Sequence, residues 1–101
     1  MKNTLIMAVL LSTMTISATA EDVVRCNTFV AVNNSGGDVQ RLLDQEQEQI
    51  PFPGWKQRVI DVRAQDNATW TAVVKGLCFA DNRMMLAVAE HNAAKTLLNI
   101  N

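Results

Sequence analysis

The chain has 101 residues and a nearly balanced charge, with nine Lys and Arg against ten Asp and Glu, so its formal net charge is −1 at pH 7. This length suits a single domain, and the lack of a basic patch in the sequence argues against nucleic-acid binding. One His and two Cys are too few ligands for a Cys/His metal site if the cysteines are bridged.

The N-terminus has the three parts of a secretory signal peptide. Lys2 supplies a positive charge, residues 4–11 are mostly apolar, and residues 18–20 read Ala-Thr-Ala, a small-x-small cleavage pattern. The apolar run is shorter than a bilayer-spanning helix requires, and no second run of membrane length follows. We therefore predict a signal peptide over residues 1–20, a mature domain over residues 21–101 and no membrane span after cleavage; a retained N-terminal anchor is the alternative.

Cys26 and Cys78 are the two cysteines of the chain. In a small exported domain such a pair favours a disulfide, and neither cysteine has another partner in the mature sequence. Closing a loop of about fifty residues stabilises a fold by roughly 4 kcal/mol on the chain-entropy model. A mature domain of 81 residues is close to the size at which its core alone is marginal. We expect the bridge to be a large part of its stability; two free buried thiols are the alternative.

The first mature segment, residues 21–33, fits two interpretations. Its apolar residues recur at a helical spacing, and Glu21 and Asp22 favour a helix N-terminus. These apolar residues are Val23, Cys26, Phe29 and Val30. The density of β-branched residues also suits a strand, so the local sequence leaves helix and strand open. Residues 33–37, rich in Asn and Gly, are expected to form a loop.

Residues 38–49 are predicted to form a second helix, which Asp38 caps. Its apolar face consists of Val39, Leu42 and Leu43. The next position on this face is Glu46, a carboxylate where a hydrophobic residue is expected. We interpret Glu46 as lying at the solvated rim; the alternative is a partly buried acid that contributes to a pH response.

Pro51 and Pro53 end the second helix, because proline lacks a backbone donor and disfavours helix in the residue before it. The next segment is residues 55–63, whose apolar residues include Val59, Ile60 and Val62. The segment is too short to classify, and a short helix and an extended segment both fit it.

Residues 68–79 carry the clearest helical pattern, and Thr69 or Asn67 is placed to cap it. The buried stripe is predicted to be Trp70, Val73, Val74, Leu77 and Cys78. Because the stripe ends on a cysteine, this helix is predicted to be both core and covalent anchor.

Asp81 or Asn82 is expected to start a last helix. Its stripe is predicted to be Leu86, Ala89, Ala93, Leu97 and Ile100. Taken together, the patterns are mainly helical and indicate one small domain with two distant cysteines.

The sequence offers little for catalysis. Nucleophilic catalysis needs a nucleophile, a base and an orienting group, but Ser35 is the sole serine after residue 20 and lies in a glycine loop. His91 falls within the last helix and is interpreted as a solvated helix residue. No glycine-rich phosphate loop is present. We therefore expect no enzyme activity, no catalytic residues, no metal and no cofactor.

Three runs of the sequence resemble the HdeA-type periplasmic acid-stress chaperones. Residues 26–33, Cys-Asn-Thr-Phe-Val-Ala-Val-Asn, are similar to the family's first-cysteine motif. Residues 59–63 resemble its Val-Leu-Asp-Val-Gln run, and residues 68–78 resemble the run into its second cysteine. The resemblance covers about residues 24–82. The chain departs from the family in having Val24-Arg25 where a Trp is common, and in a C-terminus with few lysines.

This resemblance implies an all-α fold, a small single-domain bundle of about four helices stapled by one disulfide between Cys26 and Cys78, in a periplasmic protein. It also implies a homodimer at neutral pH that dissociates and partly unfolds in strong acid. The opened chain would then hold unfolding periplasmic proteins, without ATP or a cofactor. The segments offered to clients, or buried in the dimer at neutral pH, are expected to include Phe29, Val30, Val32, Val59, Ile60, Val62 and Trp70.

The charge of the mature chain permits such a response. Eight Lys and Arg against ten carboxylates give about −2 at neutral pH. Protonating the carboxylates leaves about +10, counting His91 and the new N-terminus, and such self-repulsion strains a compact state. The candidate pH-sensing residues are Asp38, Glu46, Asp61 and Asp81.

Two other functions compete with the chaperone hypothesis. One is a periplasmic immunity or inhibitor protein that blocks a toxic cell-wall enzyme, with the acidic segment 44–48 as its docking surface. The other is a domain of the same fold whose role has diverged, which the lysine-poor C-terminus keeps open.

Overall fold

The computed structural model describes residues 23–99, so the predicted signal peptide and the stripe residue Ile100 lie outside the described residues. The described chain forms five helices: α2 (Cys26–Asn34), α3 (Val39–Gln47), α4 (Trp55–Gln65), α5 (Asn67–Ala80) and α6 (Leu86–Leu97). The predicted all-α fold is confirmed. Both segments that the sequence left open, the one after the expected cleavage point and the one after the prolines, are helical.

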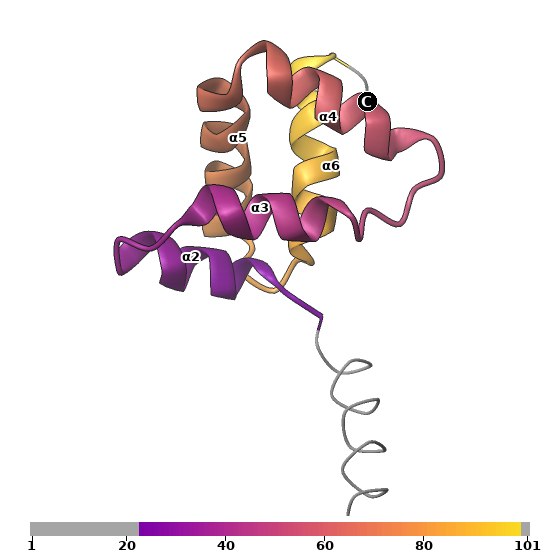
Figure 1. Cartoon of the computed structure of the whole chain (residues 1–101). Helices are drawn as coiled ribbons and strands as arrows, with labels where there is room; N and C mark the ends of the chain where they lie inside the picture. Colours follow the sequence, from indigo (N-terminus) through magenta and orange to yellow (C-terminus); the bar gives the residue numbers. More distant parts are fainter. Residues whose placement is uncertain (1–22, 100–101) are drawn as a thin grey trace, which may run out of the picture.

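The helices pack around α6, which contacts each of the other four. Figure 1 shows α5 and α6 side by side, with α2 and α3 running across one end of the pair and α4 crossing near the other. Alanines make up much of the buried face of α6 and let its neighbours approach closely. These residues are Ala87, Ala89, Ala93 and Ala94.

The core is one cluster to which every helix contributes. Its largest fully buried apolar side chains are Trp70, Phe29, Leu43, Leu86, Val59 and Val74. Among residues 23–99, no helix is long and apolar enough to cross a membrane.

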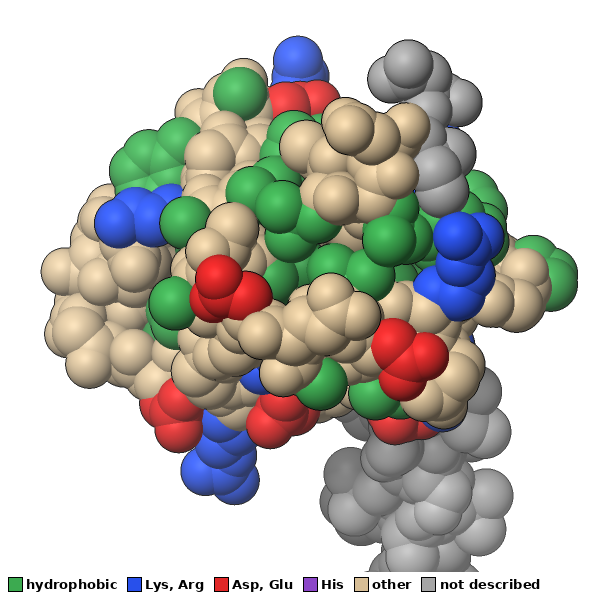
Figure 2. Space-filling view, turned by 90° about the horizontal axis from the view of Figure 1, so that it is seen from above, with side chains coloured by type: hydrophobic (Ala, Val, Ile, Leu, Met, Phe, Trp, Pro, Cys, Tyr) green, Lys and Arg blue, Asp and Glu red, His purple; other side chains and the backbone are tan. Residues whose placement is uncertain are grey.

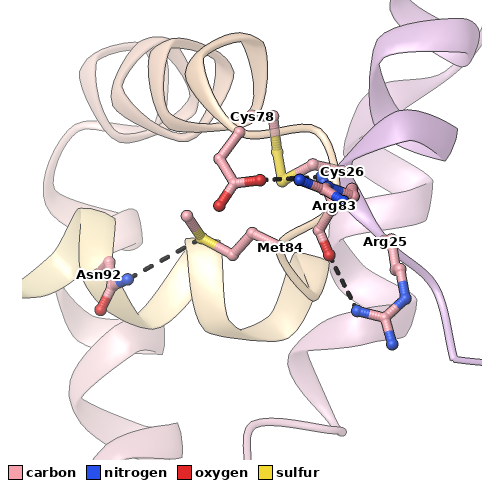
Figure 3. Close-up of a disulfide and its surroundings, with 7 residues drawn as sticks. Arg25, Cys26, Cys78, Arg83, Met84 and Asn92 are labelled. Atoms are coloured by element: carbon pink, nitrogen blue, oxygen red, sulfur yellow. Dashed lines mark hydrogen bonds between the residues drawn. A yellow bond between two sulfur atoms is a disulfide. The ribbon is translucent and has the colours of Figure 1, made fainter.

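The predicted disulfide is confirmed and lies within this core. Cys26, at the start of α2, is bonded to Cys78, near the end of α5, with their Cα atoms 4.9 Å apart. Figure 3 shows the bridge beside Arg83 and Met84 in the turn before α6. The backbone N–H of Cys26 donates to the carbonyl of Met84 at 2.8 Å, and Arg25 Nη1 donates to the carbonyl of Arg83 at 2.9 Å. Covalent and hydrogen bonds thus join the start of α2 to the α5–α6 connection.

Two helix starts differ from those predicted. The cap of α5 is Asp66, which accepts hydrogen bonds from the backbone N–H and hydroxyl of Thr69 at 3.1 and 2.7 Å. The last helix begins at Leu86, whereas Asp81 lies at the C-terminal cap of α5. The reason is that the backbone between the two helices pairs with the chain before α2, where Leu86 N–H donates to Val24 O at 2.9 Å.

Asp38 caps α3 as predicted, accepting from the backbone N–H of Arg41 at 3.0 Å. After Pro51 and Pro53, Gly54 turns the chain into α4 with φ 80°, a left-handed conformation that glycine adopts without steric cost. The connection folds back over α6 and brings Phe52 and Trp55 onto it.

Candidate functional site

Arg63 of α4 is the centre of a polar network between α3, α4 and α5. Its side chain is 13% exposed, and its Nη1 lies 2.6 Å from Oδ1 of Asp44 on α3. Nε donates to Asn67 at 2.8 Å, Nη1 to Gln47 at 3.3 Å and Nη2 to Gln40 at 2.7 Å. We call these five residues the Arg63 network. Each guanidinium nitrogen contacts a side-chain oxygen, so the network joins one side of α3 to the end of α4 and the start of α5.

The network covers the largest buried side chain of the core. The guanidinium carbon of Arg63 lies 4.8 Å from the centre of a Trp70 ring, within the range of a cation–π contact. Trp70 is fully buried, and its indole N–H donates to the backbone carbonyl of Glu90 at 3.4 Å. Disrupting the network would therefore loosen the cover of the core at Trp70.

A groove of about 350 Å³ runs along the network. Its lining residues are Asp44, Gln47, Ile60, Arg63, Ala64 and Asn67. The guanidinium is already bonded to neighbouring helices, so the groove serves as a helix junction rather than as a ready anion site. Within residues 23–99, no group of three or more His, Cys, Asp or Glu is arranged to hold a metal ion.

Glu90 of α6 is a fully buried carboxyl group. Neither of its oxygens has a hydrogen-bond partner among the described residues. Burial raises the pKa of Glu90 to about 9; the nearby positive charge of Arg63 opposes the shift, and the negative charges of Glu46 and Asp44 add to it. At neutral pH this side chain is therefore a protonated, uncharged acid.

His91, the next residue of α6, is 6% exposed, so its interpretation as a solvated residue is wrong. Its ring stacks on Phe52 with centroids 4.1 Å apart and meets Trp55 edge-on at 4.6 Å. Nδ1 has no hydrogen-bond partner among residues 23–99. Burial lowers the pKa of His91, a hydrogen bond with Asn92 raises it, and the charge of Lys95 lowers it. His91 is buried because the segment after α3 folds back over α6, a contact that the helix's own sequence does not show.

The candidate pH-sensing residues lie in different parts of the structure. Glu46 is 7% exposed, so its placement at a solvated rim is wrong, and the alternative of a partly buried acid describes its position. Asp38, Asp61 and Asp81 are exposed: Asp38 caps α3, Asp61 accepts from Gln57 of the same helix at 2.9 Å, and Asp81 accepts from the backbone N–H of Arg83 at 3.1 Å. Of these four residues, Glu46 is the one whose negative charge raises the pKa of Glu90.

The candidate client-binding residues are mostly inside the folded chain. Four of them are buried in the single core cluster: Phe29, Val59, Val62 and Trp70. The other three, Val30, Val32 and Ile60, are partly buried. A folded chain therefore offers little of this set to a client.

Sequence inspection missed the Arg63 network and the burial of Glu90 and His91. The network joins residues 40 to 67 through side chains of ordinary polar type, which carry no pattern along the chain. Glu90 did leave a signal, because it stands four residues after Leu86 and one after Ala89, on the apolar stripe.

No family model, curated protein or solved structure matches this chain. The family hypothesis therefore depends on the three runs of sequence that resemble HdeA-type chaperones. The helical fold and the Cys26–Cys78 pairing agree with what that resemblance implies. The presence of two cysteines also predicts the bridge, and helical periodicity predicts several of the helices.

Proposed function

We propose that this protein acts in the periplasm as an ATP-independent chaperone that opens in strong acid and holds unfolding proteins. The observation that carries the proposal is the Asp44–Arg63 ion pair above buried Trp70. In strong acid, Asp and Glu carboxylates are protonated, while Arg keeps its charge. A poorly exposed guanidinium without its counter-ion is costly, so acid weakens the contact between α3 and α4 at the cover of the core.

A second ion pair of the same kind lies at the other end of this contact. Lys56, near the start of α4, pairs with Glu48, just after α3. Both partners are well exposed, so this pair alone contributes little. Its loss adds to the change in net charge from about −2 to about +10, which favours expansion of the whole domain.

Opening at this junction would release apolar surface that the closed domain hides. Trp70 and Val59 lie at the packed surfaces of α5 and α4, and both are fully buried. The disulfide resists acid and ties α2 to α5 in the opened state. The chain would thus expose a client-binding surface and stay compact enough to close again at neutral pH.

The proposed homodimer at neutral pH would need surface other than Phe29 and Trp70, which are buried within one chain. Within residues 23–99, the large apolar side chains that remain exposed are Val23, Phe52, Phe79, Leu97 and Leu98. Figure 2 shows apolar side chains gathered across the middle of one face, with charged residues around it. Sedimentation at pH 7 and pH 2.5 tests whether a dimer forms and dissociates.

The inhibitor hypothesis has little support from the acidic segment 44–48 at the C-terminal end of α3. Asp44 is paired with Arg63, Glu48 is paired with Lys56, and Glu46 is buried. The carboxylates that would form a docking surface are therefore engaged within the domain or buried. This function remains the second candidate and would appear as one stoichiometric partner at neutral pH.

The decisive experiment measures light scattering from an acid-sensitive client mixed with the mature protein. We expect suppressed aggregation at pH 2–3 and none at pH 7. Asp44→Asn removes the ion pair at every pH and should lower the free energy of unfolding at pH 7 by about 1 kcal/mol, a small value because Asp44 is 69% exposed. The variant should therefore open, and begin to hold the client, at a higher pH than the wild type.

Asp61→Asn is the matched control, since Asp61 is exposed and bonded within its own helix. It should leave the opening pH close to that of the wild type. Absence of suppression at every pH would refute the chaperone function. Equal shifts in both variants would show that total charge, and not the Arg63 network, sets the opening.

A further inference from the structure

We propose that Glu90 and His91 form a compensating pair of buried titratable groups, both held uncharged by the fold, whose contributions to the stability of the folded domain change in opposite directions as the pH falls through mild acid. In strong acid the ion pairs and surface carboxylates are lost, and the stability falls. This inference rests on the proposed function for its biological meaning. The pH dependence of folding stability that it predicts is a property of the domain without any client.

One positively charged group and two negatively charged groups act on the carboxyl group of Glu90. Arg63 approaches from α4, and Asp44 and Glu46 from α3. From α5 comes Trp70, which does not titrate; Lys75, the charged residue of that helix, is exposed and stacks on Phe79. No residue of α2 is charged. The carboxyl group is thus fully enclosed between packed helices, a position that favours its neutral form.

The surroundings of His91 also favour its neutral form. Phe52 and Trp55 enclose its ring, and the guanidinium of Arg58 lies 4.1 Å from the centre of the Trp55 ring. On α6 itself, the charged residue that bears on the imidazole is Lys95, about one turn further along. Protonation would place a positive charge in a nearly closed aromatic site near other cations. The two neighbouring residues of α6 are therefore both held uncharged.

Because the pKa of Glu90 is raised, the folded state binds a proton that the unfolded state releases above its ordinary pKa of 4.5. The stabilising contribution is complete below that value and is lost as the pH rises through about 9. As the pH falls from 9 to 4.5, Glu90 alone raises the folding constant by up to tenfold per pH unit.

His91 acts in the opposite direction. Its pKa is lowered from the ordinary 6.5, so its contribution is complete above 6.5 and is lost as the pH falls toward the folded value. Just below pH 6.5 the loss from His91 opposes the gain from Glu90, until the pH reaches the folded pKa of His91. Below pH 4.5 Glu90 gives no further gain, since the unfolded chain is then also protonated at this residue. Acid therefore acts on stability through the remaining carboxylates.

The test compares the wild type with Glu90→Gln and His91→Phe, which keep the size or the ring but do not titrate. Folding constants are measured by denaturant unfolding of the disulfide-bonded mature protein from pH 4.5 to pH 9. The wild-type constant should fall as the pH rises toward 9, and should change least with pH just below 6.5. The folding constant of Glu90→Gln, divided by that of the wild type, should rise with pH by up to tenfold per pH unit. The folding constant of His91→Phe, divided by that of the wild type, should rise as the pH falls below 6.5.

If the ratio of the Glu90→Gln folding constant to that of the wild type stays constant within twofold from pH 4.5 to pH 9, the proposal is overturned. If this variant does not fold, Glu90→Met provides the same comparison, and the carboxyl ¹³C shift of Glu90 in the wild type reports its protonation directly. A carboxyl that titrates near its ordinary value would also refute the pair. No client is involved, so failure of the compensation and failure of the chaperone function are separate results.

Discussion

Asp66 is exposed, yet it closes the first turn of α5 by accepting two hydrogen bonds from Thr69. These bonds favour the charged carboxylate and lower the pKa of Asp66 from its ordinary value of 3.8. Its contribution to stability is therefore present above 3.8 and is lost as the pH falls through the folded value. A single cap of this type makes the helix that carries Trp70 and Cys78 sensitive to strong acid.

Asp66→Ala should lower the free energy of unfolding at pH 7, because the cap bonds to Thr69 are lost. The difference from the wild type should shrink as the pH falls below 3.8. Asp66→Asn is the control, since Asn also caps helices but does not titrate. Denaturant unfolding at pH 7 and pH 3 measures both effects; a difference that stays constant with pH would contradict this account of the cap.

The burial of Glu90 and His91 is difficult to predict from the sequence of their own helix. A polar residue within a helix is usually solvated, and nothing within α6 distinguishes these two residues from surface positions except their place beside the alanine stripe. Their burial comes from α3, α4, α5 and the Phe52 segment, which lie up to fifty residues earlier in the chain.

Among the elements, α2 depends most on the covalent link. It is nine residues long, too short to be stable alone, and it presents Phe29 and Cys26 to the core. The disulfide spans 52 positions of sequence and ties α2 to α5. The hydrogen bonds between the chain before α2 and the turn before α6 add to this link.

Reduction of the disulfide should therefore lower the free energy of unfolding by about 4 kcal/mol, as expected for a loop of this length. Thermal unfolding with and without a reductant measures the effect. A Cys26→Ser, Cys78→Ser double variant without reductant is the control for effects of the reductant itself. An unchanged unfolding temperature in both cases would show that the helices hold α2 without the bridge.

The element α4 shows how turn chemistry decides what periodicity leaves open. Residues 55–63 carry too few apolar positions for a clear helical pattern, but Gly54 directs the chain into a helix whose buried face contains Val59 and Val62. The same helix brings Arg63 onto Trp70. The sequence supplies the residues of this junction, whereas the packing of three helices brings them together.

For the whole molecule, the proposed opening is a balance between a small core and a large change in charge. The proposed mature chain, residues 21–101, moves from about −2 to about +10 when its carboxylates are protonated. In 1 M salt the screening length is about 3 Å, compared with about 10 Å at 0.1 M. Charge repulsion across the domain is therefore much weaker in high salt.

We expect the opening midpoint, followed by circular dichroism, to move to lower pH when NaCl is raised from 0.1 to 1 M. Urea unfolding at pH 7 in the same salts is the control, because the net charge is then small and the change should be minor. A midpoint that stays constant or moves to higher pH would show that local contacts outweigh overall repulsion.

The sequence by itself determined the helices around residues 38–49 and 68–79, the Cys26–Cys78 pairing and the core residues Trp70 and Val74. Helical periodicity depends on residues close together in the sequence, and two cysteines allow one pairing. Both can therefore be predicted without the tertiary structure. The tertiary structure alone decided that Arg63 covers Trp70, and that Glu90 and His91 are buried without charge. Burial and ion pairing depend on segments that are distant in the chain, and the free energy of a titratable group depends on that environment.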